Sequence, residues 1–308
     1  KTKIKTGTQT IKIKKYKFTY EIKMPHTNHL NLKNSYGNVT LGEHKGRVNM
    51  AIYEGSVMAA KMTPTEGIIS LKYSDATLGS AKDLKMEGYE SKVIIGETSL
   101  LNLNAKYCNI IAESKKVNLK TYELKLQTGK IDDLTLSDSK YSKIVCSEVE
   151  SLTITNAYEN DMIFSKLRTV TGNTKYCKID IGKLQESMSV TGYEMTCRID
   201  ELSPDFKNLK VEGKYSKLYA NLKSGTGFQL SSDLTYGNIT YPQSNFVSSK
   251  NDKKDTRWVL EGKTKGYSGQ SMISVKGFET DVSLTYRWTT IPVRFGNEKF
   301  GMQLLMEI

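Results

Sequence analysis

The chain has 308 residues and a formal net charge of +12, from 45 Lys and Arg residues against 33 Asp and Glu residues. Only six of the basic residues are Arg, whose planar guanidinium pairs with phosphates and base edges. The charge therefore argues against nucleic-acid binding and indicates a lysine-rich surface that could attract acidic polysaccharides or lipid headgroups. No apolar run approaches the roughly 20 residues that span a bilayer, so no transmembrane segment is predicted.

The first segment alternates Lys with Ile, Tyr and Phe, and it reads IKIKKYKFTYEIK from Ile11 to Lys23. Alternation with period two indicates a strand, and lysines on an edge strand prevent pairing with other chains. We therefore predict an N-terminal edge strand and cap over residues 1–30. The chain begins at Lys1 rather than Met, which fits a signal peptide removed on export.

A short unit centred on tyrosine repeats between residues 36 and 236, with a mean step of about 18 residues. The tyrosines are Tyr36, Tyr53, Tyr73, Tyr89, Tyr107, Tyr122, Tyr141, Tyr158, Tyr176, Tyr193, Tyr215 and Tyr236. An apolar-polar-apolar triplet precedes and follows most of them, as with Leu209/Val211 before Tyr215. Each unit is therefore strand, corner, strand with one buried face. The sequence predicts an all-β, right-handed parallel β-solenoid over residues 31–245.

The residue after each tyrosine alternates between a small residue and Glu. Glu follows at positions 54, 90, 123, 159 and 194, and the alternation ends with Tyr215 and Tyr236, which are both followed by small residues. Corners of one kind recur about every 35 residues. Because like corners would then stack on like, we predict that two units form one circuit of about 35 residues with four short strands.

The repeat loosens after Pro242. Ser248 to Thr256 is predicted to be a polar loop, after which two units resume with Phe278 in the tyrosine place. The apolar segment from Arg287 to Ile308 is predicted to cap the last open edge. Residues 246–308 thus hold the polar loop, the final units and a C-terminal cap, and the chain forms one continuous structural domain.

The motifs NSYGNVTL, TYGNITY and KYSDATL resemble the repeats of the adhesin-like DUF4097 and DUF2807 class, which is common in Bacteroidetes envelopes. The resemblance covers roughly residues 30–290. It implies a β-strand-repeat solenoid that is exported to the periplasm or outer surface of a Gram-negative bacterium, with adhesion as its role. It brings no catalytic residues. The tyrosine corners depart from the class, which often carries Ser-Gly there.

The tyrosines have two interpretations. Flat rings can pack against pyranose faces, which makes Tyr73, Tyr107, Tyr141, Tyr176 and Tyr215 the ligand-binding candidates. Alternatively, the rings stack in an offset ladder along the solenoid with their hydroxyls at the surface. The ladder explains why tyrosine recurs at every corner, whereas a binding site needs only a few.

The corner glutamates would repel one another if they were stacked directly, and a Ca²⁺ column would need several carboxylates per ion. We expect instead that each carboxylate is solvated and accepts N–H groups at its corner. His26 and His29 in HTNH suit a metal only on a helix, which the sequence does not predict. No metal or cofactor is therefore predicted.

The four cysteines show no metal-binding spacing. Cys108 and Cys177 share a corner position that elsewhere holds Ser or Gly, and circuits of two units would place them about 9.6 Å apart, too far for a disulfide. Cys108, Cys146, Cys177 and Cys197 are therefore predicted to be free, mostly buried thiols.

No nucleophile motif such as GxSxG appears, and the short steps between corners leave no room for the long loops that border catalytic grooves. We predict a non-catalytic cell-envelope protein, an adhesin or a binding scaffold for glycans or envelope proteins. Two alternatives remain. One is a polysaccharide-active lyase or hydrolase with converging carboxylates, and the other is a periplasmic sensor or assembly partner that uses the apolar C-terminal tail.

Overall fold

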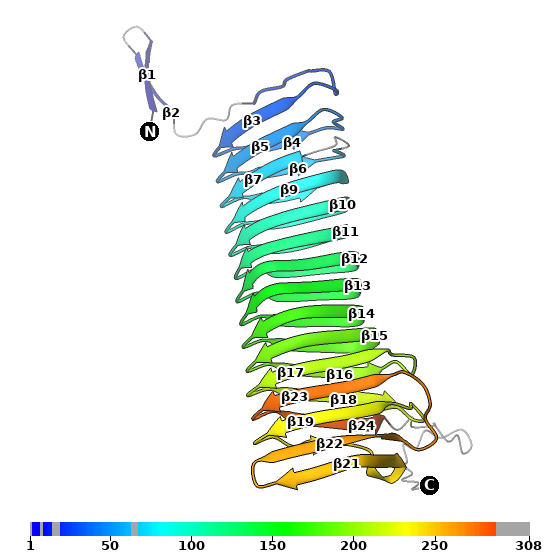
Figure 1. Cartoon of the computed structure of the whole chain (residues 1–308). Coiled ribbons are helices and arrows are strands. Elements are labelled where there is room, and N and C mark those ends of the chain that lie inside the picture. The colour runs from blue at the N-terminus through cyan, green and yellow to red at the C-terminus, as the bar shows by residue number, and fades with distance from the viewer. Residues whose placement is uncertain (1, 7–8, 14–18, 63–66, 288–308) are drawn as a thin grey trace, which may run out of the picture.

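The computed structural model describes residues 2–6, 9–13, 19–62 and 67–287. β1 (Thr2–Thr6) and β2 (Gln9–Ile13) form a separate antiparallel hairpin. The other strands form one tall β-solenoid, as predicted (Figure 1). Almost the whole predicted C-terminal cap, residues 288–308, lies outside the described residues.

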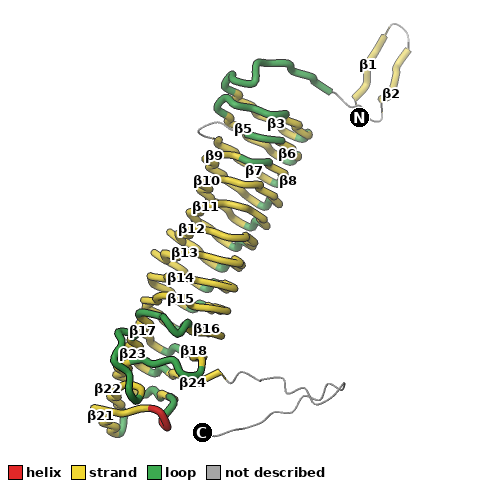
Figure 2. The backbone as a smooth tube through the Cα atoms, turned by 90° about the vertical axis from the view of Figure 1, so that its right-hand side faces the viewer, coloured by secondary structure: helices red, strands yellow, loops and turns green. Residues whose placement is uncertain are grey.

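The solenoid grows by parallel stacking of successive strands, which Figure 2 shows in a single column. Its first strands are short: β3 (Leu30–Ser35), β4 (Asn38–Leu41), β5 (Val48–Tyr53), β6 (Ser56–Ala59), β7 (Gly67–Lys72), β8 (Asp75–Leu78) and β9 (Ala81–Tyr89). In the middle, one bent strand covers a whole circuit: β10 (Lys92–Lys106), β11 (Asn109–Tyr122), β12 (Lys125–Lys140), β13 (Lys143–Tyr158), β14 (Asp161–Lys175) and β15 (Lys178–Tyr193). β16 (Thr196–Leu202) and β17 (Asn208–Lys214) share the next circuit.

One circuit, hereafter a coil, contains one tyrosine unit. Val93 of β10 pairs with Ile110 of β11, and Ile110 pairs with Leu126 of β12. Neighbouring units in the sequence are therefore neighbours in space. The prediction of circuits of about 35 residues is wrong, and each coil takes about 18 residues.

The alternation of corner types arises because the tyrosine stands one residue earlier in every second coil. Tyr122 is paired with Lys106 in the preceding coil and with Lys140 in the following one. This defines a first corner position, which holds Lys or Tyr in turn through most of the solenoid and holds Ser35, Thr235 and Phe278 near its two ends. The next residue, the second corner position, holds Tyr where the first is Lys and Glu where the first is Tyr. The spacing to the following apolar residues differs between the two corner types for the same reason.

The second corner position has a left-handed backbone in every coil. Tyr141 has φ of 54° and Glu159 has φ of 50°. They are two of the thirteen non-glycine residues of the described chain that have a positive φ. Left-handed backbone is unfavourable for residues with a Cβ, so each corner must be held by its neighbours. The third corner position contributes, because Ser142 Oγ donates a hydrogen bond to Lys140 O at 2.9 Å.

The rings of all coils form one continuous aromatic ladder. Twelve ring pairs join Tyr36 to Tyr236, with centroids 5.2–5.8 Å apart and interplanar angles of 68–87°. The predicted ladder exists, but its geometry is edge-to-face rather than offset-stacked. The one-residue shift explains this, because rings in adjacent coils start from different corner positions and meet edge to face, an arrangement that the quadrupoles favour.

Inside the solenoid, each coil places apolar side chains directly over those of the coil before. Leu101, Val117, Leu134 and Leu152 follow one another in register and are at most 1% exposed. A single coil cannot enclose such residues, so stability comes from stacking between neighbours.

All four cysteines are free and buried, as predicted. Cys108 and Cys177 occupy the third corner position four coils apart, about 19 Å by strand spacing. Each donates a hydrogen bond from Sγ to the carbonyl two residues earlier, as the serines there do. Burial raises the pKa of the Cys146 and Cys197 thiols to about 12.

We expect the native protein to leave all four thiols unmodified by an aromatic disulfide reagent at neutral pH, because each is buried and burial suppresses the reactive thiolate. After unfolding in guanidinium, all four should react. Absorbance of the released thiolate measures both states. Rapid modification of any thiol in the native protein would contradict its burial.

The C-terminal coils depart from sequence order. The strands are β18 (Lys217–Lys223), β19 (Gln229–Thr235), β20 (Ile239–Thr240), β21 (Phe246–Lys254), β22 (Arg257–Thr264), β23 (Met272–Phe278) and β24 (Asp281–Arg287), with one 3-10 turn, η1 (Gln243–Asn245). β21 and β22 form an antiparallel hairpin on β19. β23 then returns between β17 and β19, parallel to both, and β24 lies between β18 and β20. Figure 1 shows the orange β23 among earlier strands.

The predicted polar loop over Ser248–Thr256 is wrong for most of its length. Residues 248–254 belong to β21, and only Asp255 and Thr256 form the turn to β22. The segment looked like a loop because its side chains are mostly exposed. It is an outer strand that pairs on one side only with β22, and such strands tolerate polar residues on both faces.

Candidate functional site

The five candidate tyrosines lie along one edge of the solenoid. Each occupies the second corner position, and each is 40–45% exposed; they are Tyr73, Tyr107, Tyr141, Tyr176 and Tyr215. Because they alternate with the glutamate coils, neighbours in this row are two coils apart, about 9.6 Å. The fold thus brings together all five residues chosen from the sequence.

The corner glutamates fill the gaps in this row. Glu90 and Glu123 lie in the coils on either side of Tyr107 at the same position. Directly stacked glutamates, which the sequence prediction implied, do not occur among the described coils, because a tyrosine separates each pair. The repulsion that would have required a cation is therefore weak. No group of three metal-ligating side chains lies close together in the described part of the chain.

A groove of about 840 Å³ follows this edge through the first coils. Its wall includes two candidate rings, Tyr73 and Tyr107, and four carboxylates, Glu54, Asp75, Glu90 and Glu123, together with Lys92, Lys125 and Asn109. Aromatic rings offer apolar faces, whereas carboxylates accept and ammonium groups donate hydrogen bonds. Such a surface suits a ligand with many hydroxyl groups and apolar C–H faces.

Charges at the corner interact with the rings. Lys72 Nζ lies 5.5 Å from the centroid of Tyr73 and 5.8 Å from the centroids of Tyr53 and Tyr89, within cation–π range. Hydrogen bonding with Glu159 is the largest cause that raises the pKa of Tyr158, and Glu90 has the same effect on Tyr89. Glu159 and Glu90 therefore stabilise the neutral phenols of Tyr158 and Tyr89.

Replacing Glu159 with Gln should change stability little at neutral pH and lower the pKa of Tyr158 toward the ordinary 10.0. In the wild type the folded phenol keeps its proton more tightly than the unfolded one. The stability that Tyr158 gains from its raised pKa is therefore complete below pH 10.0 and is lost as the pH rises through the folded pKa. Phenolate absorbance gives the titration, and denaturant unfolding in alkali should show a smaller loss for the variant. An unchanged titration would exclude the contact.

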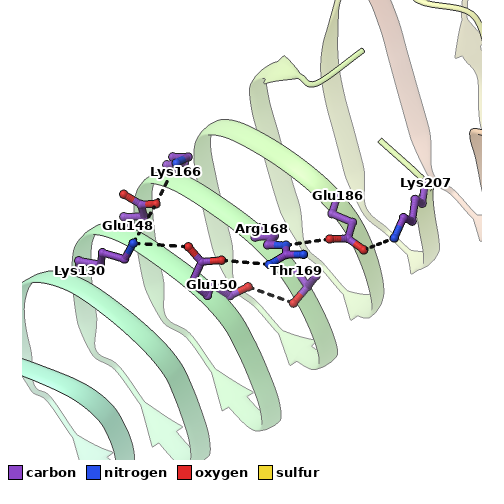
Figure 3. Close-up of polar contacts among 8 residues, drawn as sticks. All are labelled: Lys130, Glu148, Glu150, Lys166, Arg168, Thr169, Glu186 and Lys207. Atoms are coloured by element: carbon purple, nitrogen blue, oxygen red, sulfur yellow. Dashed lines mark hydrogen bonds and ion pairs between the residues drawn. The ribbon is translucent and has the colours of Figure 1, made fainter. Parts of the chain in front are cut away.

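A second cluster, an ion-pair ladder, links side chains of successive coils in the stretch between their corners (Figure 3). Glu148 accepts from Lys166 Nζ at 2.8 Å, and Glu186 accepts from Arg168 Nε at 2.8 Å and from Lys207 Nζ at 2.6 Å. These bases lower the pKa values of Glu148 and Glu186. The sequence analysis missed this ladder. The signal was there, since Lys130, Glu148 and Lys166 follow at one register position with alternating charge.

A second groove, of about 770 Å³, lies beside the out-of-order coil. Tyr193 and Phe278 line it with Lys175, Lys214 and Lys276, and Arg257 forms its wall from the hairpin. Arg257 donates two hydrogen bonds to Asp233, both of 2.7 Å. Sequence reasoning could not find this groove, because the part of its wall from Lys276 to Phe278 is placed there only by the insertion of β23.

Two of the three histidines form hydrogen bonds between the segment before β3 and the first coils. His44 is buried and its Nε2 lies 2.8 Å from Asn28 O, while His29 Nδ1 accepts from Arg47 N at 3.3 Å. These contacts tie the segment before β3 to the coil below it.

No protein-family model, no curated protein and no solved structure matches the chain. Within the described residues, no helix has the length and apolar character needed to cross a membrane.

Proposed function

We propose that this protein is a non-catalytic scaffold of the cell envelope, an adhesin that binds extended glycans along its tyrosine edge. The observation that carries the proposal is the periodic row of half-exposed rings, with a carboxylate between each pair and a groove along the first members. Export to the periplasm or outer surface of a Gram-negative cell is part of the same proposal.

A repeating surface fits a repeating ligand. The row offers a ring about every 9.6 Å, and a glycan chain likewise presents its sugar faces at regular intervals. Tyrosine rings pack against the apolar faces of sugars, and the glutamates accept hydrogen bonds from hydroxyl groups. Several equivalent contacts along one chain would add up, so a ligand held weakly at each ring could still bind well.

Binding to a glycan array at physiological salt tests the proposal. Replacing Tyr107 with Ser should weaken binding of a selected glycan about tenfold, the loss expected for one aromatic contact of ~1.4 kcal/mol. Tyr122→Ser is the matched control, since its ring is in the same ladder but at the less exposed first position.

The outcomes separate the functions. Equal losses in both variants would mean that the ladder matters only for folding. Binding to any acidic polymer that disappears at physiological salt would reduce the protein to a general polycation. Cleavage of a glycan that is lost in both Glu90→Gln and Glu123→Gln would favour the polysaccharide-active alternative, which the carboxylates of the groove permit.

A further inference from the structure

The coil formed by β23 and β24 is a complete circuit that arrives out of order. β23 pairs with β17 along one side and with β19 along the other, from Met272 to Phe278 in both cases. β24 pairs with β18 from Asp281 to Arg287 and with the short β20 at Val282 and Ser283. Neither neighbouring coil is its neighbour in sequence, since the hairpin of β21 and β22 is interposed.

The inserted coil fits its slot by the rules of the whole solenoid. Ile273, Val275, Val282 and Leu284 are at most 3% exposed. The Phe278 ring lies 5.6 Å from Tyr215 on one side and 5.6 Å from Tyr236 on the other. These contacts hold the coil by backbone hydrogen bonds and apolar burial rather than by continuity of the chain.

The slot also selects what fills it. Tyr215 and Tyr236 both occupy the second corner position, so stacking their coils directly would place two rings at the same position in adjacent coils. Each ring contact of the ladder instead joins a ring at the first corner position to a ring at the second. The slot therefore requires an aromatic residue at the first corner position followed by a residue with a left-handed backbone, which Phe278 and Glu279 (φ 47°) supply.

We propose that the slot between the β17–β18 coil and the β19–β20 coil is a binding site for an extended strand-corner-strand peptide, and that a second copy of this chain can fill it with its own β23–β24. Strand addition to open sheet edges is a common mode of peptide recognition, and here the peptide would meet two edges at once. The second copy is the partner because β23–β24 carries the matching pattern and is joined to the hairpin only through the loop of residues 265–271. Exchange of an identical element is an inexpensive route to a dimer.

The test uses the full chain with Val275→Asp, which places a charge in the buried face of the inserted coil and disfavours its insertion. A labelled peptide of residues 270–287 should then bind this variant saturably with one peptide per chain. Val190→Asp is the matched control, because Val190, Val211 and Val275 form one buried column but Val190 lies in a coil that follows sequence order. It should bind no peptide.

Two results would overturn the site: a folded Val275→Asp protein that binds no peptide, or equal binding of a peptide that itself carries the Asp. If the variant does not fold, a protease site within residues 265–271 of the wild-type chain replaces it. Cleavage then frees the end of the native coil, and uptake of labelled peptide with release of the C-terminal fragment supports the site. Absence of exchange under mild denaturant overturns it.

The partner is tested separately by mixing wild-type protein with Val275→Asp and measuring mass in solution. A one-to-one dimer that excess peptide dissolves supports exchange between copies. Peptide binding without this dimer would leave the site standing and overturn the second copy as its occupant.

Discussion

Ile179→Asp should be among the most damaging single substitutions in the protein, with an expected loss of about 4 kcal/mol or more in the free energy of unfolding. Ile179 is fully buried, and its neighbours in register are Met162 in the coil before and Cys197 in the coil after. A carboxylate there would lose its hydration, because the side chains above and below it are apolar and fully buried. The substitution also removes the packing that two adjacent coils share.

Urea unfolding followed by circular dichroism measures this loss. Gln127→Asp is the control, because Gln127 is an exposed strand residue paired with Ile111 and Val145. It should stay within about 0.5 kcal/mol of the wild type. A midpoint for Ile179→Asp close to that of the wild type would show that position 179 does not face the core.

Gly172→Ala should cost more than about 3 kcal/mol although it adds a single methyl group. Gly172 lies inside β14 with φ of 144°, a conformation that is almost restricted to glycine. A Cβ there would lie 2.0 Å from Ile154 O and 2.6 Å from Ile154 Cβ in the preceding coil. The clash involves backbone, so no rotation of a side chain can relieve it.

Gly129→Ala is the matched control for this prediction. Gly129 also lies within a coil-spanning strand, but, apart from its two chain neighbours, no residue has an atom within 4 Å of the position that its Cβ would take. Alanine there should be neutral or slightly stabilising, because it reduces the freedom of the unfolded chain. Equal stability of the two alanine variants in urea would contradict the positive φ of Gly172.

The tyrosine edge shows how far local patterns reach. Period-two alternation predicted the strands, and the recurrence of tyrosine identified every corner up to Tyr236, so the five candidate residues could be assigned to corners as a group. The exposure of their rings could not be predicted, because it depends on which corner position each ring occupies. That position follows from pairing between coils, as Tyr122 with Lys106 and Lys140 shows.

A corner motif alone does not make a corner. TYEIKM at Thr19 to Met24 closely matches the corner TYELKL at Thr121 to Leu126. Yet Tyr20 is 83% exposed and Ile22 is 77% exposed, whereas Leu124 is fully buried. From Lys23 to Ser35 the chain has fewer residues than the 14 of β11, so it is short for a full coil. Burial of a corner requires a complete coil on which to stack.

By itself, the sequence determined the all-β solenoid, its corners and its inward faces, because these follow from the alternation of side chains along each strand. Which coils are neighbours could be seen only in the folded molecule, since pairing between strands is set by contacts between distant residues. The sequence does carry one trace of that pairing. The alternation fails between Tyr215 and Tyr236 because the missing corner, Phe278 with Glu279, is supplied from farther along the chain and lies between them.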